Sequence, residues 1–220
     1  MQHFVGLDCA HKSLGVSYIT FDPTQYSKII ELSTILKTEI NLTKVLSLLK
    51  QINQCLDNVI NVRHVEIINL LGNQHIKDLN FVERTGLLKT ALEQIDKNIS
   101  LYFAPLSKIP TILVEYQMSA NFKSHDIYTG IIYHYVLRYN IISIGPSLKQ
   151  TIAFTNEGKY EHFIKKYSSN YAANKAHSKF NVTKWLTVFG KLNMIKDMKK
   201  IDDIGDAVLM SIGHIFKNNR

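Results

Sequence analysis

The sequence has few of the residues that mark disordered, secreted or membrane-spanning chains. Its 220 residues include 10 Gly, 4 Pro and 2 Cys, and 45% of them are hydrophobic. This composition excludes a collagen-like or mostly disordered chain, and two cysteines are too few for a disulfide framework. No apolar run approaches the roughly 20 residues that span a bilayer, so we expect no membrane partner. The N-terminus lacks the basic start and apolar stretch of a secretory signal, which favours an intracellular protein.

Positive charge is concentrated in one part of the chain. The protein carries 26 Lys and Arg against 18 Asp and Glu, which gives a net charge of +8. The stretch from Ser147 to Lys200 holds eleven Lys, no Arg and three acids, so it accounts for the whole excess. Clustered cations are what phosphate binding requires, so we expect a polyanion partner, with nucleic acid ahead of an anionic membrane surface. A solvated basic surface with no such partner is the alternative.

The spacing of apolar residues predicts strands first, and then helices and strands in alternation. Apolar and β-branched runs predict strands at residues 4–8, 16–21, 29–35, 64–71, 111–114 and 141–144. Helical spacing predicts helices at residues 42–60, 122–139 and 202–216, one that follows a capping box of Asn80 and Glu83, and one around Val182 and Leu186.

The order of these elements defines the fold class. A short turn joins the first two strands, so we expect them to form an antiparallel hairpin. The buried strands that follow are separated by helices, which implies parallel pairing. The sequence therefore predicts an α/β fold with a mixed sheet, an antiparallel leading hairpin and helices on both faces.

Acidic residues stand where these elements end or begin. Asp8 ends the first strand and Glu115 ends a buried one, while Asp202, Asp203 and Asp206 open the last helix. Carboxylates that gather at one edge of a sheet repel each other unless a cation neutralises them, and oxygen ligands select Mg²⁺ or Mn²⁺. Taken singly, Asp8 is explained as a solvated strand end and the helix acids as caps. A solvated position does not explain Glu115, because this residue directly follows an apolar run that we expect to be buried.

Three segments carry a resemblance to a known family. Phe4-Val-Gly-Leu-Asp8, with Gly15 in the following turn, resembles the first strand and hairpin of the RuvC-type Holliday junction resolvases, which belong to the RNase H-like superfamily. The segment Ile112-Leu-Val-Glu-Tyr-Gln117 is similar to the strand that ends in Glu in that family. Asp202-Asp-Ile-Gly-Asp-Ala-Val-Leu209 resembles its C-terminal helix. The variant looks most like the resolvases of large DNA viruses, such as poxviruses and iridoviruses, and their mitochondrial relatives.

The resemblance implies a five-stranded RNase H-like sheet and a set of site residues. It implies that Asp8, Glu115, Asp203 and Asp206 are the catalytic metal ligands, with Asp202 able to replace Asp203. The implied cofactor is Mg²⁺, with Mn²⁺ as its substitute. The implied chemistry is two-metal hydrolysis of a phosphodiester, with Lys179 or Lys175 offsetting charge on the phosphate. Lys149, Lys175 and Lys179 lie in segments that resemble the lysine-bearing part of the family, and we expect them to bind nucleic acid.

The resemblance also implies a substrate and an assembly. We expect a single domain over residues 1–220 with an insertion around residues 38–62, because Asp8 and Glu115 are further apart than in this family. The implied activity is symmetric cleavage of four-way DNA junctions by a homodimer, in viral recombination or concatemer processing. The implied location is the host cytoplasm for a viral protein, and otherwise the nucleus or mitochondrion. Two alternatives stay open: a nuclease for RNA–DNA hybrids or flaps, and a junction-binding protein without activity.

Overall fold

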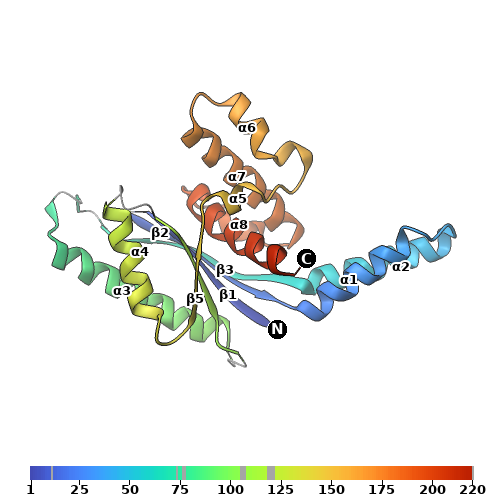
Figure 1. Ribbon diagram of the computed structural model, residues 1–220, viewed down its shortest axis with the longest axis horizontal. Coiled ribbons are helices and arrows are strands. Elements are labelled where there is room, and N and C mark those ends of the chain that lie inside the picture. Colours follow the sequence, from blue (N-terminus) through green and yellow to red (C-terminus); the bar gives the residue numbers. More distant parts are fainter. Residues whose placement is uncertain (11, 73, 76–77, 105–107, 118–121, 220) are drawn as a thin grey trace.

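A five-stranded mixed sheet forms the centre of the fold (Figure 1). The computed structural model describes residues 1–10, 12–72, 74–75, 78–104, 108–117 and 122–219. The strands are β1 (Gln2–Cys9), β2 (Ser13–Phe21), β3 (Ile60–Asn69), β4 (Thr111–Glu115) and β5 (Asn140–Ile144), in the spatial order β3-β2-β1-β4-β5. The pairs β1/β2 and β2/β3 are antiparallel, whereas β1/β4 and β4/β5 are parallel. The predicted α/β class and leading hairpin are confirmed.

Helices cover both faces of this sheet, as predicted (Figure 1). They are α1 (Pro23–Leu36), α2 (Leu42–Val59), α3 (Phe81–Tyr102), α4 (Phe122–Tyr135), α5 (Ser147–Gln150), α6 (Tyr160–Lys166), α7 (Asn170–Val188) and α8 (Ile201–Asn218). Side chains that alternate along β1 enter two separate cores: Val5 and Leu7 pack with α3 and α4, while Phe4 packs with α8. No helix in the described part of the chain is long and apolar enough to cross a membrane.

The predicted capping box is present at the start of α3. The Asn80 side chain accepts a hydrogen bond from the Glu83 backbone N–H at 3.0 Å, and the Glu83 carboxylate accepts one from the Asn80 N–H at 2.7 Å. Both bonds satisfy N–H groups that the first turn of a helix leaves unpaired.

Helix α8 lies directly on the sheet because glycines face it. A Cβ at Gly6 would lie 2.5 Å from the carbonyl oxygen of Ala207, and one at Gly15 would lie 2.3 Å from that of Asp203. Ser17 Oγ stabilises the contact between β2 and α8 by donating a hydrogen bond to the Ala207 carbonyl at 3.1 Å. The first turns of α8 are thereby brought close to the end of β1.

The prediction of a strand at residues 29–35 is wrong, because this segment lies in α1. Asp22 and Pro23, which look like a strand terminator in the sequence, begin the helix. The Asp22 side chain accepts hydrogen bonds from the Thr24 and Gln25 N–H groups, and Pro23 occupies the first turn. Helices α1 and α2 pack along each other and form the whole connection between β2 and β3. The predicted insertion around residues 38–62 remains a prediction.

Candidate active site

Two acids stand side by side at the end of the sheet. The parallel register pairs Leu7 of β1 with Val114 of β4. Asp8 and Glu115 are the next residues of these two adjacent strands. Both point to the face that α8 covers, and they are only 8% and 7% exposed. Asp206, on the second turn of α8, approaches the same place from above the sheet. We call Asp8, Glu115 and Asp206 the carboxylate cluster.

Lys149, from the short helix α5, lies inside the carboxylate cluster. Its Nζ is 2.9 Å from Oε1 of Glu115 and 2.5 Å from Oδ2 of Asp206. The Lys149 side chain is 12% exposed, so these are buried ion pairs. Lys149 and the three acids line one small pocket together with Gly145, Pro146 and Met210. Each acid comes from a different element, so the cluster exists only in the folded chain.

The buried charges of the carboxylate cluster shift its pKa values. Burial, and then a hydrogen bond to Glu115 and the repulsion of that carboxylate, raise the pKa of Asp8 well above its ordinary value. Burial also acts to raise the pKa of Glu115, but the hydrogen bond with Asp8 and the charge of Lys149 outweigh it, and the net shift is downward. Of the two carboxyl groups, Asp8 is therefore the harder to ionise and Glu115 the easier. Burial raises the pKa of Asp206, against the opposing effects of Lys149 and Ser178.

The other two acids of α8 lie outside the carboxylate cluster. Asp203 Oδ2 accepts a hydrogen bond from Ser13 Oγ at 3.3 Å and lies 3.8 Å from Lys200 Nζ. Asp202 forms an ion pair with Lys175 on α7. The structure therefore brings together three of the four predicted ligands, and the fourth, Asp203, faces β2 one turn earlier on the same helix.

The three lysines that the sequence singles out differ in their surroundings. Lys149, which we expect to bind nucleic acid, is the one that touches the acids. Lys179, expected beside the phosphate, is exposed on α7. The preceding residue, Ser178, is the one that faces α8, and one step along a helix turns the side chain by about 100°. Lys175 pairs with Asp202, and that hydrogen bond, against the effect of burial, raises its pKa.

Two polar residues that the sequence did not single out as site residues hold the acids in place. Ser178 Oγ donates a hydrogen bond to Oδ1 of Asp206, and Ser178 is 1% exposed. Gln117 Nε2 donates to Oε2 of Glu115 at 3.4 Å. A serine within a lysine-rich helix carries no signal of this role in the sequence, whereas Gln117 belongs to the segment that resembles the resolvase family.

The composition of the carboxylate cluster fits a hard divalent cation. In the described residues, no group of three or more His, Cys, Asp or Glu side chains is arranged to hold a metal ion. In the cluster itself, the Lys149 ammonium lies between Glu115 and Asp206, where it supplies positive charge. Three buried carboxylates with oxygen-only donors suit Mg²⁺ or Mn²⁺ better than zinc. In the same cluster the pKa of Asp8 is raised. A cation nearby would reverse this shift, because positive charge favours the ionised carboxylate.

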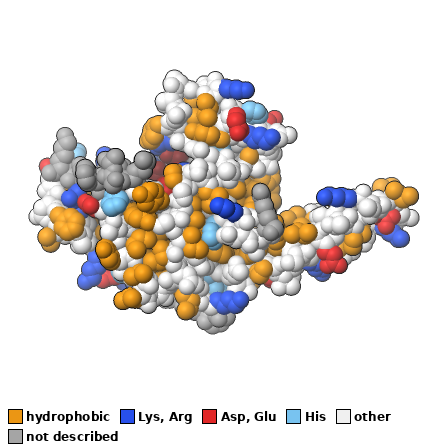
Figure 2. Space-filling model, in the orientation of Figure 1, with side chains coloured by type: hydrophobic (Ala, Val, Ile, Leu, Met, Phe, Trp, Pro, Cys, Tyr) orange, Lys and Arg blue, Asp and Glu red, His pale blue; other side chains and the backbone are white. Residues whose placement is uncertain are grey.

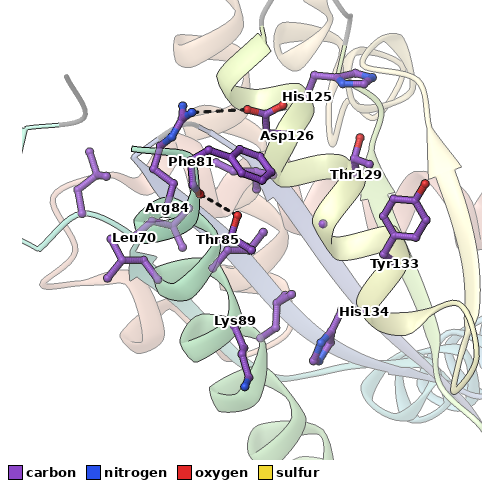
Figure 3. Close-up of a pocket in the computed structure, with 16 residues that line it drawn as sticks. Leu70, Phe81, Arg84, Thr85, Lys89, His125, Asp126, Thr129, Tyr133 and His134 are labelled. Carbon is purple, nitrogen blue, oxygen red and sulfur yellow. Dashed lines mark hydrogen bonds and ion pairs between the residues drawn. The ribbon is translucent and has the colours of Figure 1, made fainter. Parts of the chain in front are cut away.

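A hollow lined mostly by apolar side chains lies on the other face of the sheet. It has a volume of about 700 Å³ and lies between α3 and α4 (Figure 3). Phe81 and Tyr133 flank it, and Arg84 of α3 forms an ion pair with Asp126 of α4 at 4.0 Å (Figure 3). Because none of the acids of the carboxylate cluster lines it, this groove is separate from the candidate active site.

The fold matches that of solved structures of junction-resolving nucleases. No protein-family model and no curated protein sequence matches the chain significantly. The structure nevertheless resembles solved structures of the RuvC class, and the likeness shows a shared RNase H-like fold.

Two of these structures were solved with junction DNA. The Fowlpox virus resolvase, in complex with substrate Holliday junction DNA, has a TM-score of 0.56 and 11% identity, and the match covers 100% of both chains. T. thermophilus RuvC, in complex with a Holliday junction substrate, has a TM-score of 0.53 and 11% identity, over 99% of this chain and 95% of that one. At these identities the likeness concerns the fold alone.

Proposed function

We propose that this protein is a Mg²⁺-dependent, structure-selective DNA endonuclease that resolves four-way junctions. The observation that carries the proposal is the carboxylate cluster, in which three acids from β1, β4 and α8 meet around Lys149 at one end of an RNase H-like sheet. Buried acids of this kind are costly without a cation to neutralise them. The likeness to resolvases solved with Holliday junctions supports the choice of substrate.

Asp8, Glu115 and Asp206 would hold the metal, and Asp203, one turn before Asp206, is the further ligand that the family resemblance implies. Such ions activate water as the nucleophile and stabilise the leaving 3′-oxygen of a phosphodiester. The protein contributes a preorganised site. Gln117 and Ser178 orient Glu115 and Asp206 by hydrogen bonds. Burial raises the pKa of Asp8, and the positive charge of a bound cation would favour its ionised form.

Lys149 is placed to act on charge near the scissile phosphate. Its ammonium now neutralises Glu115 and Asp206. If the carboxylates bound a divalent ion, the ammonium would be available to offset charge on the phosphate, the role that the family resemblance implies for Lys179 or Lys175.

The basic helices next to the carboxylate cluster fit a phosphate backbone. α6 and α7 lie on the same side of the sheet as the cluster (Figure 1). They expose Lys165, Lys166, Lys179 and Lys184. We propose that these side chains bind the DNA arms by backbone contacts, which position a duplex without reading its sequence.

A junction of two crossed duplexes has near two-fold symmetry, so we propose that a homodimer applies two active sites to opposed strands. One candidate for the dimer interface is the apolar stripe of α4. In the structure Ile131 and Tyr135 of that stripe are buried in the core, whereas Val136 is 54% exposed just beyond the helix. We further propose a role in viral DNA recombination or concatemer processing, which the resemblance to viral resolvases supports.

Comparative cleavage tests the substrate. We expect the protein with Mg²⁺ to cut a mobile four-way junction into nicked duplexes, faster than a linear duplex of the same sequence or an RNA–DNA hybrid. Faster cleavage of the hybrid would favour the alternative RNase H-like activity. Tight, salt-sensitive junction binding without cleavage across a tenfold Mg²⁺ titration would favour the non-catalytic alternative.

A further inference from the structure

A second hollow lies beside the candidate active site, over the ends of β2 and β3 and next to the segment that leads into α8. It has a volume of about 930 Å³. The strand register pairs Asp8 with Gly15, and Ser13 with Asn69, which lines the hollow. Asp8 of the carboxylate cluster and this hollow therefore lie at the same edge of the sheet. They are two strands apart, which is about 10 Å, a separation that one or two nucleotides of a single strand span.

The hollow combines apolar residues with a cluster of cations. The apolar residues that line it are buried or half-buried, and they are Ile67, Leu71 and Met198. Three exposed lysines also line it, namely Lys12, Lys199 and Lys200. Asp78 is the only acid among the described residues of its lining. An apolar surface with cations around it complements a nucleotide, which joins the flat face of a base to a negatively charged phosphate.

The lysines of the hollow are free to meet a phosphate, and one of them connects the hollow to the first turn of α8. Among the residues that the structure describes, Lys12 and Lys199 form no ion pair. Lys200 Nζ donates a hydrogen bond to Ser13 Oγ at 3.4 Å and lies 3.8 Å from Oδ2 of Asp203. Ser13 Oγ donates to the same Asp203 oxygen at 3.3 Å. The hollow is therefore continuous with the helix that carries the acids.

The shape of this place distinguishes it from the rest of the basic surface. Lys and Arg side chains are scattered over the visible face of the protein (Figure 2), and such exposed cations suffice to bind the backbone of a duplex. A hollow with an apolar lining offers a surface for a base, and a base reaches such a surface after it leaves the stack. At the crossover of a four-way junction the stack is already interrupted, which lowers the cost of taking a base out of it.

We propose that this hollow binds one unstacked nucleotide of the strand that is cut, close to the phosphate at the carboxylate cluster. The base lies against Ile67 and Met198, and its phosphate meets Lys12 and Lys199. This nucleotide determines which phosphate of the strand reaches the acids, so the hollow positions the substrate and takes no part in the chemical step. The proposal deepens the proposed function, on which it rests, because it takes a branched DNA as the substrate.

The fluorescence of 2-aminopurine, a base that is dim in a stack and bright outside it, tests the proposal. It is placed at successive positions near the crossover of a four-way junction, which is saturated with the full chain in a chelating buffer. We expect one position to brighten about threefold or more, and Lys12→Ser/Lys199→Ser to lose most of this increase. The control Lys28→Ser/Lys37→Ser removes two exposed lysines near α1, beyond the other end of β2, and keeps the signal. Fluorescence anisotropy verifies that each protein has bound the junction.

Quenching by acrylamide tests whether the unstacked base lies in the hollow or in solvent. We expect the bright base to be shielded from acrylamide in the wild-type complex. Binding without brightening at any position would overturn the proposal. So would a bright base that acrylamide quenches freely, or one that Lys12→Ser/Lys199→Ser leaves unchanged. None of these results depends on cleavage. A protein that did not bind the junction at all would contradict the proposed function as well, so the two failures are distinguishable.

Discussion

Replacing Lys149 by methionine is expected to destabilise the protein strongly when no divalent cation is present. Lys149 makes two buried ion pairs, at 2.9 Å to Glu115 and 2.5 Å to Asp206. Methionine fills much of the same volume but leaves both carboxylates without a cation. Removing one partner of a buried ion pair costs about 3–5 kcal/mol. For a chain of this size, each kcal/mol lowers the melting temperature by about 2–4 °C, so a decrease of about 6–20 °C is expected.

The assay is thermal unfolding followed by circular dichroism at neutral pH in a chelating buffer. Lys179→Met removes an exposed lysine from the same basic region and serves as the control, which is expected to melt like the wild type. Adding Mg²⁺ is expected to restore part of the loss in Lys149→Met, because a ligand at about 100 times its Kd stabilises the folded state by about 2.7 kcal/mol. If Lys149→Met melted with Lys179→Met in the chelating buffer, Lys149 would not be what neutralises the carboxylate cluster.

Three further predictions concern other parts of the molecule. Gly15→Ala is expected to lower the unfolding free energy by about 1–3 kcal/mol, because the new Cβ meets the α8 backbone. Gly86→Ala, where a Cβ has nothing within 4 Å, is the control and is expected to stabilise α3 slightly. Equal effects of the two substitutions in chemical denaturation would disprove the close contact at Gly15. Burial lowers the pKa of His177 from 6.5 to about 4. The neutral imidazole therefore contributes its full stabilisation above pH 6.5, and this contribution is lost as the pH falls towards 4. His177→Gln should remove that part of the pH dependence of the melting temperature, and an unchanged profile would contradict the prediction. Lys179→Glu is expected to weaken junction binding and to flatten the slope of log affinity against log salt by about 1, and an unaltered slope would remove Lys179 from the DNA interface.

The sequence was sufficient to predict the five strands of the sheet, though it added a sixth, and to place two of the acids, because these follow from short-range patterns. Asp8 and Glu115 each end an apolar run, and parallel neighbours must bring such residues to one edge. The wrong strand at residues 29–35 has a local cause: its β-branched residues favour a strand, whereas the cap at Asp22 and the packing of α1 on α2 favour a helix. The strand propensity of single residues is a weaker effect than helix capping and helix packing.

The details of the carboxylate cluster depend on tertiary contacts that periodicity does not contain. Asp203 and Asp206 share a helix face in the sequence, yet the approach of α8 to Gly15 directs Asp203 towards Ser13 and Asp206 towards Glu115. Lys149 is one of eleven lysines in its segment, and only the position of α5 distinguishes it from the others. Which acids and which lysine meet was therefore decided by packing between elements far apart in the sequence.

The central claim, that Asp8, Glu115 and Asp206 together support metal-dependent cleavage, is tested most directly by one paired measurement. Cleavage and binding of a four-way junction are measured with Mg²⁺ for the wild type, Asp8→Asn, Glu115→Gln and Asp206→Asn. We predict that each substitution abolishes cleavage and leaves binding intact or tighter, because it removes negative charge near the phosphate. Cleavage that survived in all three variants, or that fell only in proportion to binding, would contradict the claim.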